Sequence, residues 1–256
     1  MGGEHTHGKR LTKSFTREPG AEPEDGYRRS VEEKQQVRER IWRLLEEQGA
    51  ARFPGARGRI PNFRGAEAAA ERLAELREWH AAEVVKSNPD APQLPVRRRA
   101  RREGKTLYMA VPRLRDDRPF VRMASDPTIK KAMSEGVPTS VEDLGHVDLI
   151  VCGTVAVNRQ GVRVGKGGGY SDLELALLIE AGLVDDATTI VTTVHRLQLL
   201  DEELPETEHD FRVDIVVTPD EVVRTGARRH SPGVIWEHLD DEAIAAIPVL
   251  AALRGR

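Results

Sequence analysis

The feature that most restricts the fold of this chain is the near-continuous apolar run Val147–Val157. Such a run fits a strand that is buried on both faces, as strands are in a parallel sheet covered by helices. Four further strand patterns alternate with helical ones: Ala81–Lys86, Lys105–Val111, Thr188–Val194 and Val213–Thr218. Parallel strands need crossover connections, and the intervening helices supply them. The sequence therefore predicts an α/β fold of three layers, α/β/α, with a mostly parallel central sheet.

The first helix is expected to begin near Ser30, because Ser30 and Glu33 have the spacing of a capping box, and to end at Gly49. Further helical patterns cover Ala66–His80, Asp126–Glu135 (opened by Ser125 or Asp126), Asp172–Ala181 and Asp240–Leu253, in which Pro248 predicts a break. Arg52–Phe63 is expected to be an ordered loop and Asn88–Pro95 a turn, since prolines interrupt both.

Residues 1–27 are polar, charged and contain prolines, so we expect a flexible tail that buries too little apolar surface to fold alone. Residues 28–256 are predicted to form a single α/β domain, with a C-terminal helical extension from about residue 238. No internal repeat is visible in the sequence.

The composition restricts the compartment and the partners. The 39 basic and 42 acidic residues nearly balance, which is untypical of general nucleic-acid or membrane binders. We interpret the basic run Arg97–Arg102 as a solvated face. The single cysteine, Cys152, permits no internal disulfide, which fits a reducing compartment. No apolar stretch is long enough for a membrane span or a signal core. We therefore expect a cytoplasmic monomer or homodimer with no nucleic-acid or membrane partner.

The segment Gly161–Asp172 (GVRVGKGGGYSD) carries the chemistry, because it lies between a predicted buried strand and a predicted helix. Glycine lets the backbone approach a ligand, and N–H groups at a helix start bind anions. Arg163 and Lys166 offer charge-assisted hydrogen bonds to phosphate oxygens. Asp172 is placed to bind Mg²⁺ directly or through water. Ligands of α/β folds bind beyond the carboxyl ends of the strands, where this segment falls.

Two standard phosphate motifs do not match this segment. The Walker loop fails because Gly161 and Gly165-Lys166 are one residue too close and Gly167 replaces the hydroxyl residue. The dinucleotide fingerprint fails because Tyr170 follows Gly169. Spacing alone thus indicates a phosphate loop of unspecified class, and a plain glycine-rich hairpin remains the alternative.

The stretch VDLIVCGTVAVNRQGVRVGKGGGYSDLELAL resembles the 5-formyltetrahydrofolate cyclo-ligase family, which has a strand, a turn and the pattern G-x-R-[LI]-G-x-G-x-G-Y-Y-D. Four further features agree in order, namely Lys34 with Arg38, Asp148, Gln198 and the segment His209–Asp214. The resemblance covers roughly Val31–Thr218. The segments RIPNF and VPRL are most similar to the subgroup of methenyltetrahydrofolate synthetase domain-containing proteins.

The resemblance implies ATP and Mg²⁺ as cofactors, a reduced folate as substrate, and closure of 5-formyltetrahydrofolate to 5,10-methenyltetrahydrofolate through a phosphorylated formyl group. It makes Lys166 and Arg163 the catalytic cations and Asp172 and Asp210 the metal ligands. The nucleotide phosphates would be held by Lys34, Arg38, Gly165, Lys166, Gly167, Gly168, Gly169 and Tyr170. Tyr170 would also pack against a substrate ring.

The sequence departs from the family pattern at a few positions. Ser171 replaces the second tyrosine, and Cys152 replaces the proline of the turn. Ala91 stands where the family has an acid thought to bind the pterin, and the neighbouring Asp90 is the candidate substitute. The alternatives to a cyclo-ligase are a non-catalytic ATP- and folate-binding regulatory protein, an ATP-dependent ligase for another formyl or amide substrate, and an RNA-binding module based on Arg97–Arg102.

Overall fold

Five parallel strands occupy the centre of an eight-stranded sheet in the computed structural model of this chain, which describes residues 24–124, 127–227, 232–239 and 241–254. The order across the sheet is β11-β10-β8-β5-β1-β2-β3-β4. The parallel strands are β1 (Val84–Ser87), β2 (Thr106–Ala110), β5 (Leu149–Cys152), β8 (Thr189–Thr193) and β10 (Ile215–Val217). Each overlaps a predicted strand, so the prediction of a mostly parallel sheet is confirmed.

The strands that the sequence patterns do not predict as separate elements lie at the edges of this sheet and in a second sheet. β3 (Phe120–Arg122), β4 (Val137–Thr139) and β11 (Val222–Arg224) join the large sheet antiparallel. β6 (Ala156–Asn158) pairs with β7 (Arg163–Val164) and β9 (Leu199–Leu200) in a separate three-stranded sheet. These strands are only two or three residues long, which is too short for a periodic pattern to identify.

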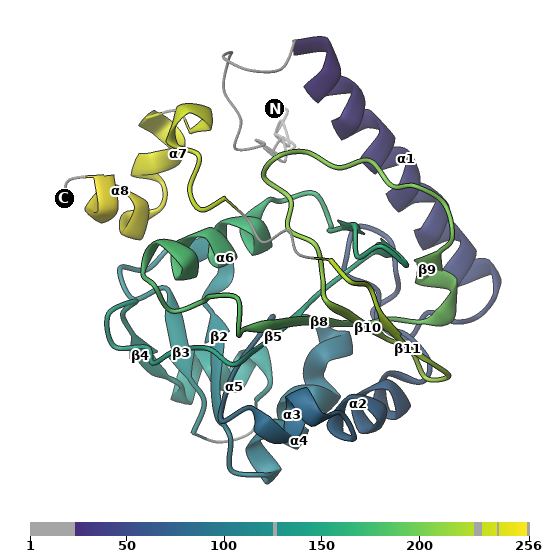
Figure 1. The fold of residues 1–256 in the computed structure, drawn as a ribbon, viewed down its shortest axis with the longest axis horizontal. Coiled ribbons are helices and arrows are strands. Elements are labelled where there is room, and N and C mark those ends of the chain that lie inside the picture. Colours follow the sequence, from purple (N-terminus) through teal and green to yellow (C-terminus); the bar gives the residue numbers. More distant parts are fainter. Residues whose placement is uncertain (1–23, 125–126, 228–231, 240, 255–256) are drawn as a thin grey trace, which may run out of the picture.

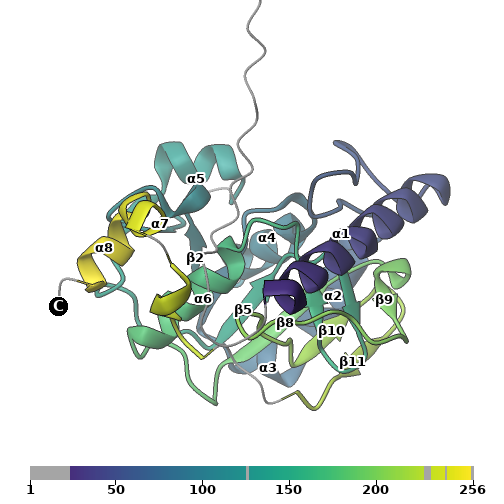
Figure 2. The ribbon, with the colours of Figure 1, turned by 90° about the horizontal axis from the view of Figure 1, so that it is seen from above.

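Helices cover both faces of the large sheet (Figures 1 and 2), and the predicted three layers are confirmed. One face carries α2 (Ala66–Ala74), α3 (Arg77–Ala81), α4 (Leu94–Arg102) and α5 (Ile129–Glu135). The other face carries α6 (Tyr170–Glu180), with α7 (Asp241–Ala245) and α8 (Pro248–Arg254) beyond it. The long helix α1 (Glu24–Glu47) packs on the small sheet.

The central strand β5 shows how the sequence fills both layers. Leu149 and Val151 belong to the core under α2 and α4, whereas Ile150 and Cys152 belong to the core under α6. Successive side chains of a strand point to opposite faces, so two covered faces require an uninterrupted apolar run.

The run Val147–Val157 is nevertheless not a single strand, which corrects the prediction. β5 ends at Cys152, and β6 begins at Ala156 in the small sheet. The break falls at Gly153, where an added Cβ would lie 2.8 Å from Asp90 Oδ2. Apolar character alone does not reveal the break, because the residues of both strands are buried.

Helix α1 begins at Glu24, so the predicted capping box at Ser30 is wrong. Ser30 lies inside the helix, and Glu33 forms an ion pair with Arg29. The first turn of α1 therefore falls within the predicted tail, and the remaining residues 1–23 of that tail lie outside the described residues. The helix ends close to Gly49, as predicted.

Two other helices have boundaries that the patterns misplace. Ala66–His80 contains the two helices α2 and α3, because the backbone is extended at Leu76. α5 begins after Thr128, whose hydroxyl accepts a backbone N–H of the first turn. The predicted caps Ser125 and Asp126 lie outside the described residues.

The basic run lies on α4, and its first arginine is buried. Arg97 is 1% exposed. Its guanidinium donates to four backbone carbonyl oxygens, those of Asn88 (2.6 Å), Pro89 (3.2 Å), Asp90 (2.9 Å) and Pro127 (2.9 Å). The interpretation as a solvated face is therefore wrong for Arg97, which instead fixes the loop of residues 88–90 that follows β1.

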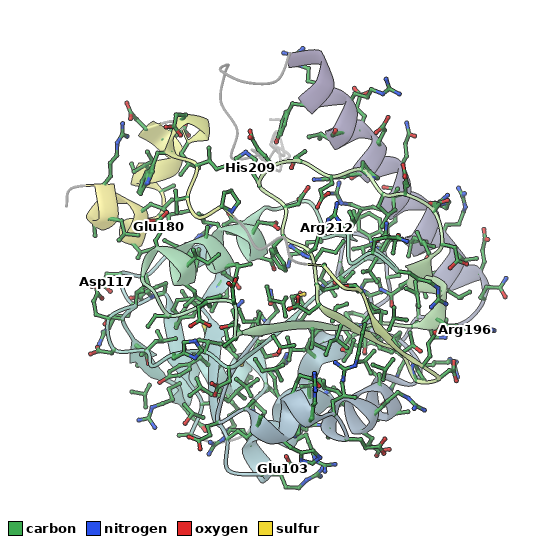
Figure 3. The ribbon with its side chains drawn as sticks, viewed as in Figure 1. Glu103, Asp117, Glu180, Arg196, His209 and Arg212 are labelled. Carbon is green, nitrogen blue, oxygen red and sulfur yellow. The ribbon has the colours of Figure 1, made fainter. Side chains whose placement is uncertain are left out.

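The C-terminal helices pack over α6, and the helical segment is interrupted before Pro248, as predicted. Glu180 on α6 accepts the backbone N–H of Val234 at 3.1 Å, on the side of α6 that faces these helices (Figure 3). Among the helices that the structure describes, none is long and apolar enough to cross a membrane.

Candidate functional site

The glycine-rich segment connects the small sheet to α6. β7 is followed by a loop of residues 165–169, and α6 begins at Tyr170. The segment lies beside the residues that follow β1 and β5: Lys166 Nζ is 3.5 Å from Asp90 Oδ1, and Arg163 donates to the carbonyl oxygen of Gly153 at 3.1 Å. It therefore lies at the carboxyl ends of adjacent parallel strands, where ligands of α/β folds bind.

Arg163 is buried beneath the loop rather than exposed on it, with 3% of its surface accessible. It donates to Asp172 Oδ1 at 2.8 Å, and its guanidinium lies 4.1 Å from the centre of the Phe211 ring. Burial lowers the pKa of Arg163, but nearby negative charge, first that of Asp172, outweighs burial and leaves the pKa above its ordinary value. Arg163 thus orients the carboxylate of Asp172 in the first turn of α6.

Lys34 and Asp210 tie α1 to the segment between β9 and β10. They form an ion pair, with side chains only 10% and 15% exposed. Lys34 Nζ also donates to the Thr207 hydroxyl at 3.3 Å, and Asp210 accepts the Thr207 backbone N–H at 2.6 Å. His209, next to Asp210, lies where this segment passes between α1 and α6 (Figure 3). Two residues that the resemblance assigned to one site are thereby brought into contact.

Arg38 lies one turn after Lys34 on α1 and reaches the glycine loop. Its Nε donates to the carbonyl oxygen of Gly165 at 2.7 Å. An added Cβ at Gly167 would lie 3.3 Å from the Arg38 guanidinium, and Gly167 has a φ of 100°. Only glycine fits this position without strain, since positive φ and close approach exclude other side chains.

The two predicted metal ligands, Asp172 and Asp210, belong to one electrostatic cluster with Arg38 and Arg163. Burial lowers the pKa of Arg38, while the charges of Asp210 and then Asp172 oppose this effect. Both carboxylates are already matched by a cation, Asp172 by Arg163 and Asp210 by Lys34. A metal that entered alone would have to compete with these cations.

The donor set fits Mg²⁺ that binds together with phosphate. Mg²⁺ is usually held by one or two carboxylates, phosphate oxygens and water. In the described part of the chain, no three His, Cys, Asp or Glu side chains gather as a metal site by themselves. Asp172 and Asp210 would supply the protein ligands.

Asp90 closes the other side of the site. Its carboxylate lies against Gly153, where an added Cβ would be 2.8 Å from Asp90 Oδ2. Its contact with the half-exposed Lys166 joins the loop after β1 to the glycine loop. Ala91, the position of the family's acid, begins a short 3₁₀ turn directly after Asp90.

Tyr170, Gly168 and Gly169 form the junction between the loop and α6. A Cβ at Gly168 would lie 3.1 Å from the Tyr170 ring, so the ring folds back over the loop. Gly169 immediately precedes the helix. These residues occupy a helix N-terminus, where partial positive charge favours anions.

The sequence patterns do not reveal a buried polar network beneath α6. Lys86 on β1 forms an ion pair with Glu174 on α6, with side chains 2% and 7% exposed. Lys86 Nζ also donates to Asn88 Oδ1 at 3.3 Å, and Asn88 Nδ2 donates to Ser171 Oγ at 2.7 Å. The available signal was a charged residue among apolar ones in each of two segments, Lys86 in EVVKS and Glu174 in DLELALLIEA.

Gln198, which matched the family spacing, has a structural role: its side chain holds the backbone of neighbouring loops. Its side-chain amide donates to the carbonyl oxygens of Thr154 and Val155 at 3.0 and 3.1 Å, and its oxygen accepts the backbone N–H of His195. It thereby fixes the turn between β5 and β6, which separates the two sheets.

The sequence matches the model of the 5-formyltetrahydrofolate cyclo-ligase family over residues 30–219. Methenyltetrahydrofolate synthase domain-containing proteins of Mus musculus and Homo sapiens are 42% and 40% identical over 238 residues. These alignments cover 87% of this chain and 63% and 62% of the relatives, so the chain spans less than two thirds of their length.

A solved structure supports the architecture. The NMR structure of Aquifex aeolicus 5,10-methenyltetrahydrofolate synthetase has a TM-score of 0.51 and 20% identity, and the match covers 78% of this chain and 95% of that one. At this identity the likeness shows the fold alone. The family match begins within α1, ends just after β10 and includes the whole candidate site. The chain belongs to the 5-formyltetrahydrofolate cyclo-ligase family, a family of enzymes.

Proposed function

We propose that this protein is an ATP- and Mg²⁺-dependent cyclo-ligase that converts 5-formyltetrahydrofolate to 5,10-methenyltetrahydrofolate through a phosphorylated formyl intermediate. The observation that carries the proposal is the set of two partly buried ion pairs, Arg163 with Asp172 and Lys34 with Asp210, beside a glycine loop at a helix start. Membership of the cyclo-ligase family supports the same reaction.

Phosphoryl transfer suits this site, because it needs positioning and charge neutralisation more than a protein nucleophile. Bound Mg·ATP would supply the γ-phosphoryl group that activates the formyl oxygen, after which ring closure by N10 expels that oxygen as phosphate, together with the N10 proton. The chain's own part is to align the two substrates and to neutralise the phosphates.

The cations divide this work by their exposure. Lys166 is half exposed on the loop and would neutralise the transferred phosphoryl group. Lys34 and Arg38, on one face of α1, would hold the remaining phosphates beside Gly165–Gly169. Arg163 is buried, so its part in catalysis would be to hold Asp172 in place.

The substrate end is proposed to consist of Tyr170 and Asp90. The Tyr170 ring lies over the loop and would pack against a ring of the folate. The Asp90 carboxylate would accept hydrogen bonds from the pterin in place of the acid missing at Ala91. A carboxylate suits this task, because its two oxygens only accept hydrogen bonds and can meet two adjacent N–H donors of an aminopyrimidine edge.

The decisive experiment follows the absorbance band of 5,10-methenyltetrahydrofolate with purified protein, Mg·ATP and 5-formyltetrahydrofolate. We expect an increase that requires ATP and Mg²⁺ and that Lys166→Ala abolishes while the variant keeps its melting temperature. No increase with any concentration of the three components would sink the proposal.

A second candidate is an ATP-dependent ligase for a different formyl or amide substrate, and the alanine at position 91 favours it. It predicts ATP hydrolysis with a small-molecule extract but none with 5-formyltetrahydrofolate. Nucleotide and folate binding without any turnover would instead support a regulatory protein.

A further inference from the structure

The hydroxyl group of Ser171 stands at the start of α6 between Tyr170 and Asp172. It is partly exposed, and its Oγ lies 2.7 Å from Asn88 Nδ2. Among the residues that the structure describes, Ser171 Oγ has no second hydrogen-bond partner. Its position replaces a tyrosine of the family pattern, so its role does not follow from the resemblance.

The neighbouring side chains determine whether the Ser171 hydroxyl donates or accepts its hydrogen bond with Asn88. Lys86 carries only donors, so the Asn88 atom that faces its ammonium group must be the oxygen. The amide nitrogen of Asn88 then points at Ser171, and it too can only donate. Ser171 Oγ therefore accepts this bond, and its own hydrogen is left to donate elsewhere.

The buried ion pair keeps this direction fixed. Lys86 and Glu174 are almost completely buried, and Asn88 is 4% exposed. A flipped Asn88 amide would place its NH₂ group against the Lys86 ammonium, and a buried donor without an acceptor is costly. Buried ion pairs contribute little to stability on balance and are retained in some proteins because they specify one arrangement.

The same network joins the two ends of the site. Asn88 lies two residues before Asp90, and Arg97 fixes this loop by donating to the carbonyl oxygens of both residues. Ser171 lies directly before Asp172, which Arg163 holds. The hydrogen of Ser171 is thus offered at the boundary between the proposed substrate loop and the proposed phosphate loop.

We propose that Ser171 is a ligand-binding residue that donates its hydroxyl hydrogen to a negatively polarised oxygen at this boundary, and that Lys86, Glu174 and Asn88 are the positioning residues that orient it. Two oxygens share the required chemistry, a nucleotide phosphate oxygen and the formyl oxygen of the folate. The inference rests on the proposed function for the identity of these two ligands.

Binding measurements with the full chain test the proposal and separate the two sources. The probes are a non-hydrolysable ATP analogue with Mg²⁺, and 5-formyltetrahydrofolate alone. Loss of a hydrogen bond to a charged group weakens binding by about tenfold or more. We expect Ser171→Ala to raise the Kd of one of the two probes by that factor and Ser171→Thr, which keeps the hydroxyl, to restore most of the affinity.

Controls separate orientation from stability. Ser134→Ala on α5, which packs near the far strand β3, should leave both Kd values unchanged. Asn88→Ala should weaken the same probe less than Ser171→Ala does, because the hydroxyl is kept but no longer oriented. The double variant should bind no more weakly than Ser171→Ala, which a purely structural role of Asn88 would not produce.

The outcomes are distinct. If Ser171→Ala keeps both Kd values within twofold of those of the wild type, the role of Ser171 is refuted although the proposed function can stand. If the wild type binds both probes but forms no methenyl product, the proposed function fails while the Ser171 inference is still decided by binding. A wild-type chain that binds neither probe overturns both.

Discussion

The two ends of the candidate site are held in different ways. At the glycine-rich end, side chain pairs with side chain: Arg163 with Asp172, and Lys34 with Asp210. At the proposed substrate end, Arg97 holds residues 88–90 through their carbonyl oxygens, and the Asp90 side chain has a long 3.5 Å contact with Lys166. The glycine-rich end thus holds its charged side chains in a fixed arrangement. At the other end the backbone is fixed, and the Asp90 carboxylate is left available.

The largest effect is expected from removing a charge at the glycine-rich end. Asp172→Asn would remove a proposed metal ligand and leave the buried Arg163 without its carboxylate. We expect kcat for methenyl formation to fall about a thousandfold, since the charge stabilisation that a metal ion provides is worth several kcal/mol. The exposed Asp201, changed to Asn, is the matched control and should keep kcat. A kcat for Asp172→Asn within tenfold of wild type would remove the metal role.

A backbone-directed change at the substrate end should act first on stability. Arg97→Met would leave up to four carbonyl oxygens without their donor. Each buried polar group left unpaired costs about 1–3 kcal/mol, and water that enters will recover part of this, so we expect about 2–4 kcal/mol less free energy of unfolding in urea.

Arg97→Met should also change the two KM values by different amounts. The KM for 5-formyltetrahydrofolate should rise more than the KM for ATP, because the loop of residues 88–90 belongs to the proposed substrate end. Arg102→Met on the exposed face of α4 serves as the control and should change neither stability nor KM. Equal effects of the two variants would show that the burial of Arg97 has no consequence.

A smaller effect is expected at Gly167, where the loop meets Arg38. Gly167→Ala would force a side chain into left-handed backbone geometry and against the guanidinium. The conformational cost is about 1–2 kcal/mol, so we expect the KM for ATP to rise about tenfold with little change for the folate. Gly145→Ala, where an added Cβ meets nothing within 4 Å, should be silent. An unchanged KM for ATP would show that Gly167 is not part of the nucleotide site.

The smallest effect is expected from Asp90, because its charge is only loosely held. Asp90→Asn keeps one acceptor oxygen, so we expect the KM for 5-formyltetrahydrofolate to rise about fivefold to tenfold while the KM for ATP stays within twofold. A rise for ATP rather than for folate would assign Asp90 to the phosphate end, through Lys166.

The sequence by itself determined the layered fold and the place of the glycine-rich loop. A long apolar run such as that of β5 can be buried only in a covered sheet. The glycines at 165 and 167–169 identify a loop by composition alone. The interpretation was also right that this loop falls between a strand and a helix, because both flanking patterns are local.

Other features depend on contacts between residues far apart in the sequence, and only the tertiary structure decided them. The break of Val147–Val157 at Gly153 follows from the approach of Asp90, and no local pattern contains that contact. Arg97 reads as a solvated residue until the loop of residues 88–90 is folded around it. Ser171 and Asn88 are separated by 83 positions, so the direction of their hydrogen bond exists only once Lys86 has been buried beneath α6.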